Sequence, residues 1–130
     1  MSKIIFFFKL IFHISTLLII ILSLYPGSLL GLIFFGNSSQ QPNLVENPFG
    51  TSINHFISYF YLSTLGLFLY LKDKKFKKIF YSLIFLSMIL EVLQIIVPNR
   101  AFQLSDLLGN IFGVLVAYFL VKIYLILIKL

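Results

Sequence analysis

Residues 91–113 read EVLQIIVPNRAFQLSDLLGNIFG, and they concentrate polar side chains in an otherwise apolar chain. The stretch holds two of the four acidic residues and the only arginine, and its charged and amide side chains are those of Glu91, Gln94, Asn99, Arg100, Gln103, Asp106 and Asn110. Pro98 lies between two apolar segments of helix length and predicts a turn between them. At about 3.6 residues per turn, the polar residues on each side of Pro98 line one face of a helix. Two helices joined by a short turn, with facing polar stripes, indicate a functional site.

The composition indicates a membrane protein. Of the 130 residues, 60% are hydrophobic and 11% are charged, and the mean hydropathy is +1.05. Such a chain has too little polar surface to cover a water-soluble globule of its size. The absence of cysteine excludes disulfides and thiolate-bound metals. The net charge of +6 comes mainly from lysines that border apolar runs, which favours a topology signal and argues against a nucleic-acid partner.

The hydrophobic pattern predicts an all-α fold, in which a single domain of residues 1–130 forms an integral membrane bundle of four transmembrane helices. The expected spans are residues 10–27, 53–71, 79–97 and 105–128. Nine of the ten lysines and arginines lie near the N-terminus, in the 72–78 loop or near the C-terminus. The positive-inside rule then places both termini and the basic 72–78 loop in the cytoplasm, and the 36–52 loop and the 98–104 turn outside.

Features outside the polar stretch allow two interpretations each. No small-residue cleavage site follows the first span, so we expect an uncleaved helix. His13 within it belongs either to a face that packs against another helix or to a site that binds a ligand or carries a proton. Residues 28–35 are apolar and are expected at the membrane interface. The 36–52 loop is either a lid or a solvated linker, and the lysines of 72–78 are either a topology signal or a docking patch for a partner or lipid.

The predicted orientation places the polar stretch in the outer leaflet. Glu91 lies about 10 Å below the outer end of its span and Gln94 about 6 Å, at about 1.5 Å per residue. Asp106 is expected nearer the mouth of the bundle and partly hydrated. A charged side chain costs about 2.5 to 3.5 kcal/mol at a helix centre, so Glu91 must be paired or protonated, and we expect Arg100 as its first partner and His55 as its second. The alternative is a structural network that only fixes the register of the helices.

The spacing of these residues resembles the signature of the VanZ-like family of small bacterial membrane proteins. The matching positions are Glu91, Gln94, Pro98, Arg100, Asp106, Asn110 and Gly113, with His55, Phe56 and Tyr59 upstream. The resemblance covers about residues 51–120 and agrees with the four-helix layout. Thr51 and Ser52 depart from it, since the family commonly has an Asp-Lys pair there, and Ala117 stands where a glycine is often found.

The resemblance implies a multi-pass protein of the bacterial cytoplasmic (inner) membrane with a role at the cell envelope. The family's name-giving member is associated with resistance to teicoplanin, a glycopeptide whose target is an outward-facing, lipid-anchored cell-wall precursor. An outward-facing polar pocket fits such a setting. Antibiotic resistance does not extend to every relative, and the resemblance names no substrate for this chain.

Three functions follow as hypotheses. The first is binding of a lipid, a lipid-linked envelope precursor or an amphipathic glycopeptide-like compound, with Arg100 engaging an anionic head group. The second is a membrane-embedded hydrolase or transferase that uses Glu91 or His55 as general base. The third is a structural or accessory subunit that needs a second copy or a membrane partner. The ligand-binding candidates are Glu91, Gln94, Arg100, Asp106, Asn110 and His55.

No cofactor and no metal ion is expected at these residues. No predicted helix carries two histidines or a Glu-x-x-His motif on one face. The positive charge of Arg100 next to the carboxylates would also repel a cation.

Overall fold

The computed structural model describes residues 3–42 and 52–128. Over these residues the chain forms the α-helices α1 (Lys3–Leu24), α2 (Leu29–Phe35), α3 (Ser52–Leu69), α4 (Phe76–Leu93) and α5 (Leu104–Leu127), and the short 3₁₀-helix η1 (Gln94–Ile96) continues α4. The described residues contain no strand, and the all-α prediction is confirmed. Thr51 and most of the predicted 36–52 loop lie outside the described residues.

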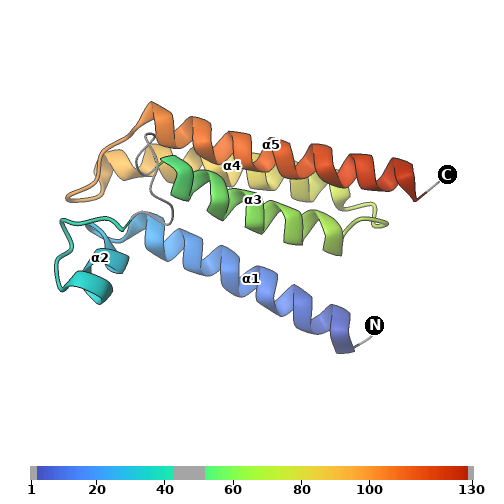
Figure 1. The fold of residues 1–130 in the computed structure, drawn as a ribbon, viewed down its shortest axis with the longest axis horizontal. Helices are drawn as coiled ribbons and strands as arrows, with labels where there is room; N and C mark the ends of the chain where they lie inside the picture. The colour runs from blue at the N-terminus through green and yellow to red at the C-terminus, as the bar shows by residue number, and fades with distance from the viewer. Residues whose placement is uncertain (1–2, 43–51, 129–130) are drawn as a thin grey trace.

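Four long helices lie side by side, and the two ends of the bundle differ (Figure 1). α3 packs most extensively against α5, and α4 packs against both of them. α1 flanks this group and contacts α3 and α4. The start of α1 and the end of α5 lie at one end of the bundle, whereas α2 and the 97–103 turn lie at the other (Figure 1).

Three of these helices are long and apolar enough to cross a membrane. They are α1, α4 together with η1 (Phe76–Ile96), and α5. α3 has 18 residues and is not among the three, because Asn54, His55 and several hydroxyl side chains lower its hydropathy. The structure and the apolar helices therefore support a membrane protein, and the fourth predicted crossing, residues 53–71, remains a proposal.

The helix boundaries follow local signals in the sequence. α1 begins at Lys3 and so extends before the expected span of residues 10–27, because residues 4–8 are apolar and contain no helix breaker. It ends at Leu24, just before Pro26 and Gly27, and Gly27 adopts a φ of 75° that favours glycine.

Residues 28–42 fold into a short turn of helix and a returning segment. The hydroxyl group of Ser28 caps α2 by accepting a hydrogen bond from the N–H of Gly31 at 2.9 Å. Gly36 ends α2 with a φ of 66°, the left-handed conformation typical of a helix C-terminus. The chain then returns over the start of α2, since the N–H of Ser28 donates to the carbonyl of Ser38 at 2.7 Å. The returning segment reaches α3, where the side-chain amide of Asn54 donates to the carbonyl of Pro42 at 2.8 Å.

Two glycines let α5 approach the backbone of α3. A Cβ atom at Gly113 would lie 2.6 Å from the carbonyl oxygen of Phe56, and one at Gly109 would lie 2.6 Å from the carbonyl oxygen of Ser52. Small residues four apart are typical of closely packed membrane helices. This close packing holds the first turns of α5 against the first turns of α3.

Candidate functional site

Buried polar side chains gather where α3 and α5 begin and α4 ends. Glu91 of α4, Gln94 of η1, and Asp106 and Asn110 of α5 are all buried, and Glu91 is 0% exposed. They come together because the short 97–103 turn joins η1 to α5 and because α5 packs against α3. The prediction that Asp106 is partly hydrated is wrong, since the residue is only 4% exposed.

Ser52 at the start of α3 contributes to the burial of Asp106. Its hydroxyl group donates a hydrogen bond to Oδ1 of Asp106 at 2.7 Å. In the sequence Ser52 was notable only as a departure from the VanZ-like pattern. Its position one helical turn before His55 was the available signal that it belongs to the same face of the helix.

His55 of α3 contacts both carboxylates through its two ring nitrogens. Nδ1 lies 3.0 Å from Oδ1 of Asn110 and 3.9 Å from Oε2 of Glu91. Nε2 lies 3.4 Å from Oδ2 of Asp106. The NH₂ group of Asn110 faces two acceptors, the carbonyl of Ser87 at 3.4 Å and Oε2 of Glu91 at 3.5 Å. The amide oxygen of Asn110 must then face His55, so Nδ1 carries a hydrogen and donates it.

Glu91 accepts hydrogen bonds from two parts of the chain. The backbone N–H of Gln103 donates to Oε1 at 3.1 Å, and the side chain of Asn110 donates to Oε2. These bonds offset part of the cost of burying a carboxylate inside a helix bundle. Glu91 thereby connects the end of α4 with the 97–103 turn and with α5.

Arg100 does not pair with Glu91, contrary to the prediction. Its guanidinium donates from Nε to the carbonyl of Tyr25 at 3.3 Å and from Nη2 to the carbonyl of Leu22 at 2.7 Å. Within the described part of the chain no ion pair joins Arg100 to Glu91. The two carbonyls belong to the C-terminal end of α1, where a helix leaves its last carbonyls without partners and where its dipole favours a cation. His55, the second predicted partner, is the basic group that contacts Glu91.

The pKa of Arg100 is influenced by its burial and by the two carboxylates. Burial lowers the pKa of Arg100 from its ordinary value, and the negative charges of Glu91 and Asp106 act in the opposite direction. A guanidinium remains protonated in proteins. Arg100 is therefore a fixed positive charge at this end of the bundle.

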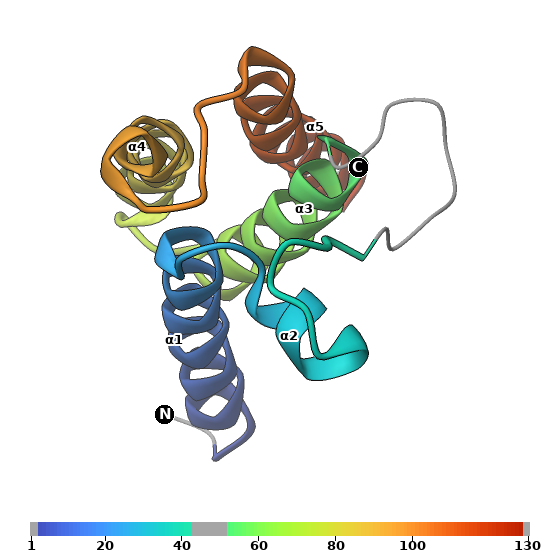
Figure 2. The ribbon, with the colours of Figure 1, turned by 90° about the vertical axis from the view of Figure 1, so that its left-hand side faces the viewer.

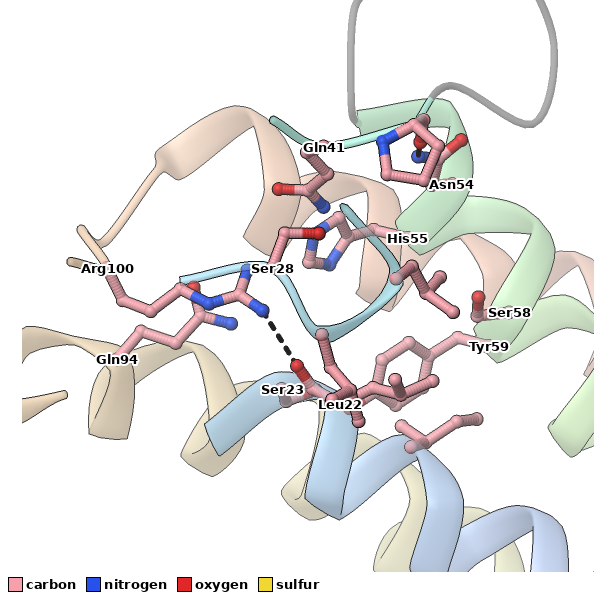
Figure 3. A pocket seen from close by; sticks show the side chains of 14 residues that line it. Leu22, Ser23, Ser28, Gln41, Asn54, His55, Ser58, Tyr59, Gln94 and Arg100 are labelled. Carbon is pink, nitrogen blue, oxygen red and sulfur yellow. Dashed lines mark hydrogen bonds between the residues drawn. The ribbon is translucent and has the colours of Figure 1, made fainter. Parts of the chain in front are cut away.

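A pocket of about 100 Å³ lies beside the buried cluster, between α1, α2 and α3 (Figure 3). Its polar lining includes Ser28, Gln41, Asn54, His55, Gln94 and Arg100, and its apolar wall includes Ile19, Leu22, Leu29 and Leu30. Both His55 and Arg100 line the pocket, whereas neither Glu91 nor Asp106 does. The basic groups thus face the space, and the carboxylates lie behind them.

A second, more open hollow of about 450 Å³ adjoins the pocket on the side of the 97–103 turn. Arg100, Gln94, Gln41 and Ser28 line both spaces. The hollow adds Ser38, Ser39, Asn99, Gln103 and Asp106, so its lining is rich in amide and hydroxyl groups. Arg100 and Gln94 therefore stand between a half-apolar inner space and a polar outer one.

In the described segments no three His, Asp or Glu side chains are grouped so that they could hold a metal ion. The positions of the carbonyls of Leu22, Tyr25 and Ser87 could not be found from the sequence, because every residue carries such a group and only the fold selects which ones meet a side chain.

The apolar helices and the buried polar cluster together define a helical membrane protein with a polar site at one end. The chain matches the model of the VanZ/LLP1 family over residues 4–127, and it belongs to this family. The predicted VanZ-like family is confirmed, and the match extends on both sides of residues 51–120. Comparison with curated proteins and with solved structures finds no significant match.

Proposed function

We propose that this VanZ/LLP1 protein binds the anionic head group of an amphipathic ligand in the pocket between α1, α2 and α3. The ligand class comprises a lipid, a lipid-linked envelope precursor or an amphipathic glycopeptide-like compound. The observation that carries the proposal is the lining of the pocket, to which Arg100 and His55 contribute and from which the two carboxylates are absent.

The bonding of Arg100 suits it to hold an anion. Two of its five N–H groups donate to the carbonyls of Leu22 and Tyr25, which fix the plane of the guanidinium. The other N–H groups belong to the same rigid plane at the boundary of the pocket and the hollow. Charge-assisted hydrogen bonds to a phosphate or carboxylate from such a fixed group are stronger than those between neutral partners.

The sizes of the two spaces determine which part of the ligand each accepts. The pocket of about 100 Å³ corresponds to a few water molecules at about 30 Å³ each and is smaller than pockets for whole ligands, which measure about 300 to 1,000 Å³. It therefore accepts one anionic group. The polar hollow of about 450 Å³ accepts the rest of the head group. The apolar wall of the pocket contacts the hydrocarbon part of the ligand; its residues are Ile19, Leu22, Leu29 and Leu30.

The charge pattern supports a position of this site in the outer leaflet of the bacterial cytoplasmic membrane. The lysines lie in or near the chain ends and the 72–78 loop, whereas Arg100 is the only basic residue in the 97–103 turn. In this proposal α3 is the fourth crossing of a multi-pass protein with both termini inside. Its 18 residues span about 27 Å at about 1.5 Å per residue, and the polar residues near its start are directed into the protein: Asn54, His55 and Ser58 line the pocket, and Ser52 bonds to α5.

The geometry favours binding over the hydrolase or transferase alternative. A general base needs a free lone pair within reach of the proton that it removes. Nδ1 of His55 donates to Asn110, and Nε2 faces Asp106 at 3.4 Å. Glu91 accepts bonds from Gln103 and Asn110 and does not line the pocket. Both candidate bases are thus engaged with the protein itself.

Binding of phosphatidylglycerol and of phosphatidylcholine to the purified protein tests the proposal. Native mass spectrometry at matched lipid concentration is expected to show preferential retention of phosphatidylglycerol. Loss of a hydrogen bond to a charged group costs about 1.5 to 3 kcal/mol, so Arg100→Gln is expected to weaken that binding about tenfold or more. Arg100→Lys, which keeps the charge, is expected to retain part of the preference for the anionic lipid.

Lys74→Gln is the matched control, because it removes one positive charge from an exposed position in the opposite loop. Equal weakening by Lys74→Gln and Arg100→Gln would show that the lipid responds to net charge alone. Equal retention of the two lipids by the unaltered protein would contradict an anion-selective pocket.

A further inference from the structure

The hollow of about 450 Å³ lies at the end of the bundle that faces the viewer in Figure 2. The 97–103 turn and the segment after α2 lie at this end, and both contribute to its lining. The lining includes the side-chain amides of Gln41, Gln94, Asn99 and Gln103. None of these four amide groups has a hydrogen-bond partner among the described residues. Because each amide can donate and accept, the hollow offers both kinds of hydrogen bond to a ligand.

Gln94 differs from the other three amides, because it is buried. Its side chain is only 3% exposed, and the residue lines both the pocket and the hollow. A buried amide without a partner is rare in folded proteins, since it has lost its bonds to water without replacing them. In Figure 3 the side chains of Gln94 and Arg100 enter the pocket from the same side. Gln94 is therefore positioned to bond to the part of a ligand that adjoins the group held by Arg100.

The lining of the hollow does not favour a second charged group on the ligand. Of the described residues in this lining, Arg100 is the only basic one and Asp106 the only acidic one. Arg100 is engaged by the first anionic group, and the oxygens of Asp106 face Ser52 and His55. The described residues of the lining also include no aromatic ring, which a quaternary ammonium group needs for a cation–π contact.

We propose that the hollow binds an uncharged polyol, such as a glycerol, inositol or sugar unit, that is joined to the anionic group held by Arg100. This inference rests on the proposed function and names the class of the head group. Hydroxyl groups donate and accept, as the free amides of the hollow do, and Gln94 bonds to the hydroxyl group nearest the anion. A peptide backbone has similar groups, but it commonly pairs with the edge of a sheet, and the described residues contain no strand.

Phosphatidylinositol and phosphatidylserine with the same acyl chains test the proposal, because they have the same net charge at neutral pH and only the first carries a polyol. Native mass spectrometry of the purified full chain is expected to show several times stronger retention of phosphatidylinositol. Equal retention of the two, with both above phosphatidylcholine, would overturn the polyol inference and leave the anion site in place. Equal retention of all three lipids would overturn both. Displacement of phosphatidylinositol by an equal concentration of water-soluble inositol phosphate would overturn the assignment to a lipid.

Substitution of the amides tests their part in the selection. Gln94→Met keeps a similar volume and removes the amide, so the preference for phosphatidylinositol over phosphatidylserine is expected to fall about twofold to tenfold, as for the loss of a neutral hydrogen bond. The preference for phosphatidylserine over phosphatidylcholine is expected to persist, because Arg100 is unchanged. Gln41→Met, at an exposed position of the same hollow, is expected to act in the same direction without a change in the buried cluster.

Gln40→Met is the matched control, because Gln40 is exposed and lines neither the pocket nor the hollow. It is expected to leave all three lipid affinities unchanged. An unchanged preference for phosphatidylinositol in both Gln94→Met and Gln41→Met would overturn the proposal, as would an equal loss in Gln40→Met.

Discussion

The side chain of His55 links α3 to groups from two other helices at the buried end of the bundle. Asp106 and Asn110 of α5 and Glu91 of α4 all approach its two nitrogens within 3.9 Å. Because Asn110 presents its oxygen to His55, Nδ1 is a donor and the orientation of the ring is fixed. The orientation of the imidazole edge toward the pocket is therefore a consequence of the amide of Asn110.

At the residue scale, we predict a strong energetic coupling between His55 and Asp106. His55→Ala and Asp106→Asn are each expected to lower the free energy of unfolding by about 1 to 3 kcal/mol, because each leaves buried polar groups without partners. Because the two side chains are in contact, the effects of the two mutations on the free energy of unfolding should be non-additive, with a coupling energy of about 0.5 to 3 kcal/mol. Reversible unfolding in mixed micelles gives the four values of the cycle. A parallel cycle of His13→Ala with Asp106→Asn, whose side chains belong to different helices and share no recorded contact, is expected to be additive, and additivity in both cycles would disprove the contact.

At the element scale, the site depends on how closely α5 approaches α3. The glycines at positions 109 and 113 let backbone meet backbone, so that Ser52 and His55 on α3 reach Asp106 and Asn110 on α5. On each helix the two residues of the site are one helical turn apart, so both lie on the face toward the other helix. α1, by contrast, packs less extensively against α3, and the pocket lies between them.

We predict that Gly113→Ala destabilises the protein. An added Cβ would lie 2.6 Å from the carbonyl oxygen of Phe56 and 2.9 Å from the backbone nitrogen of Phe60, neither of which can move without moving α3. Overpacking of this kind costs about 1 to 3 kcal/mol. On a surface that faced only lipid the same change would be neutral or stabilising, since alanine is favoured over glycine in a helix by about 1 kcal/mol. The sign of the change in the free energy of unfolding shows whether position 113 packs against α3 or faces lipid. Leu120→Ala, at an exposed position of the same helix, is the comparison.

At the scale of the whole molecule, the two ends of the bundle carry different kinds of polar group. The end with both termini has exposed lysines in the 72–78 loop, and some of its lysines lie over aromatic rings, as Lys9 does over Tyr70 at 5.0 Å. The opposite end, where the 97–103 turn lies, has amides, hydroxyl groups and the single arginine. Lysines near helix ends favour the cytoplasmic side, and we propose on this basis that the end with the lysines faces the cytoplasm.

We predict that Ser39→Cys and Asn99→Cys react with a membrane-impermeant thiol reagent applied from outside, whereas Lys75→Cys does not. All three side chains are exposed, so the difference depends on the side of the membrane and not on burial. Labelling after permeabilisation is the control for Lys75→Cys. Labelling of Lys75→Cys alone from outside would reverse the proposed orientation and place the pocket on the cytoplasmic side.

The class of protein could be deduced from the sequence because burial in lipid is read from composition and from the length of apolar runs. The same applies to the helices, whose ends follow Pro26, Gly27, Gly36 and Pro98, and to the family, whose residues stand at fixed spacing. These properties depend on which residues are neighbours along the sequence. The polar residues of the site could also be identified from the sequence, since each has an unfavourable free energy of transfer into a membrane and so stands out in an apolar segment.

Only the tertiary structure decided which of these polar groups meet. Charge alone suggested that Arg100 would pair with Glu91, but the end of α1 offers the carbonyls of Leu22 and Tyr25, and Arg100 binds those instead. Asp106 is buried rather than hydrated because α3 covers it. Backbone carbonyls are identical in every residue, and the distance between two helices is set by packing over their whole length, so neither the partners nor the pocket between them can be derived from the order of the side chains.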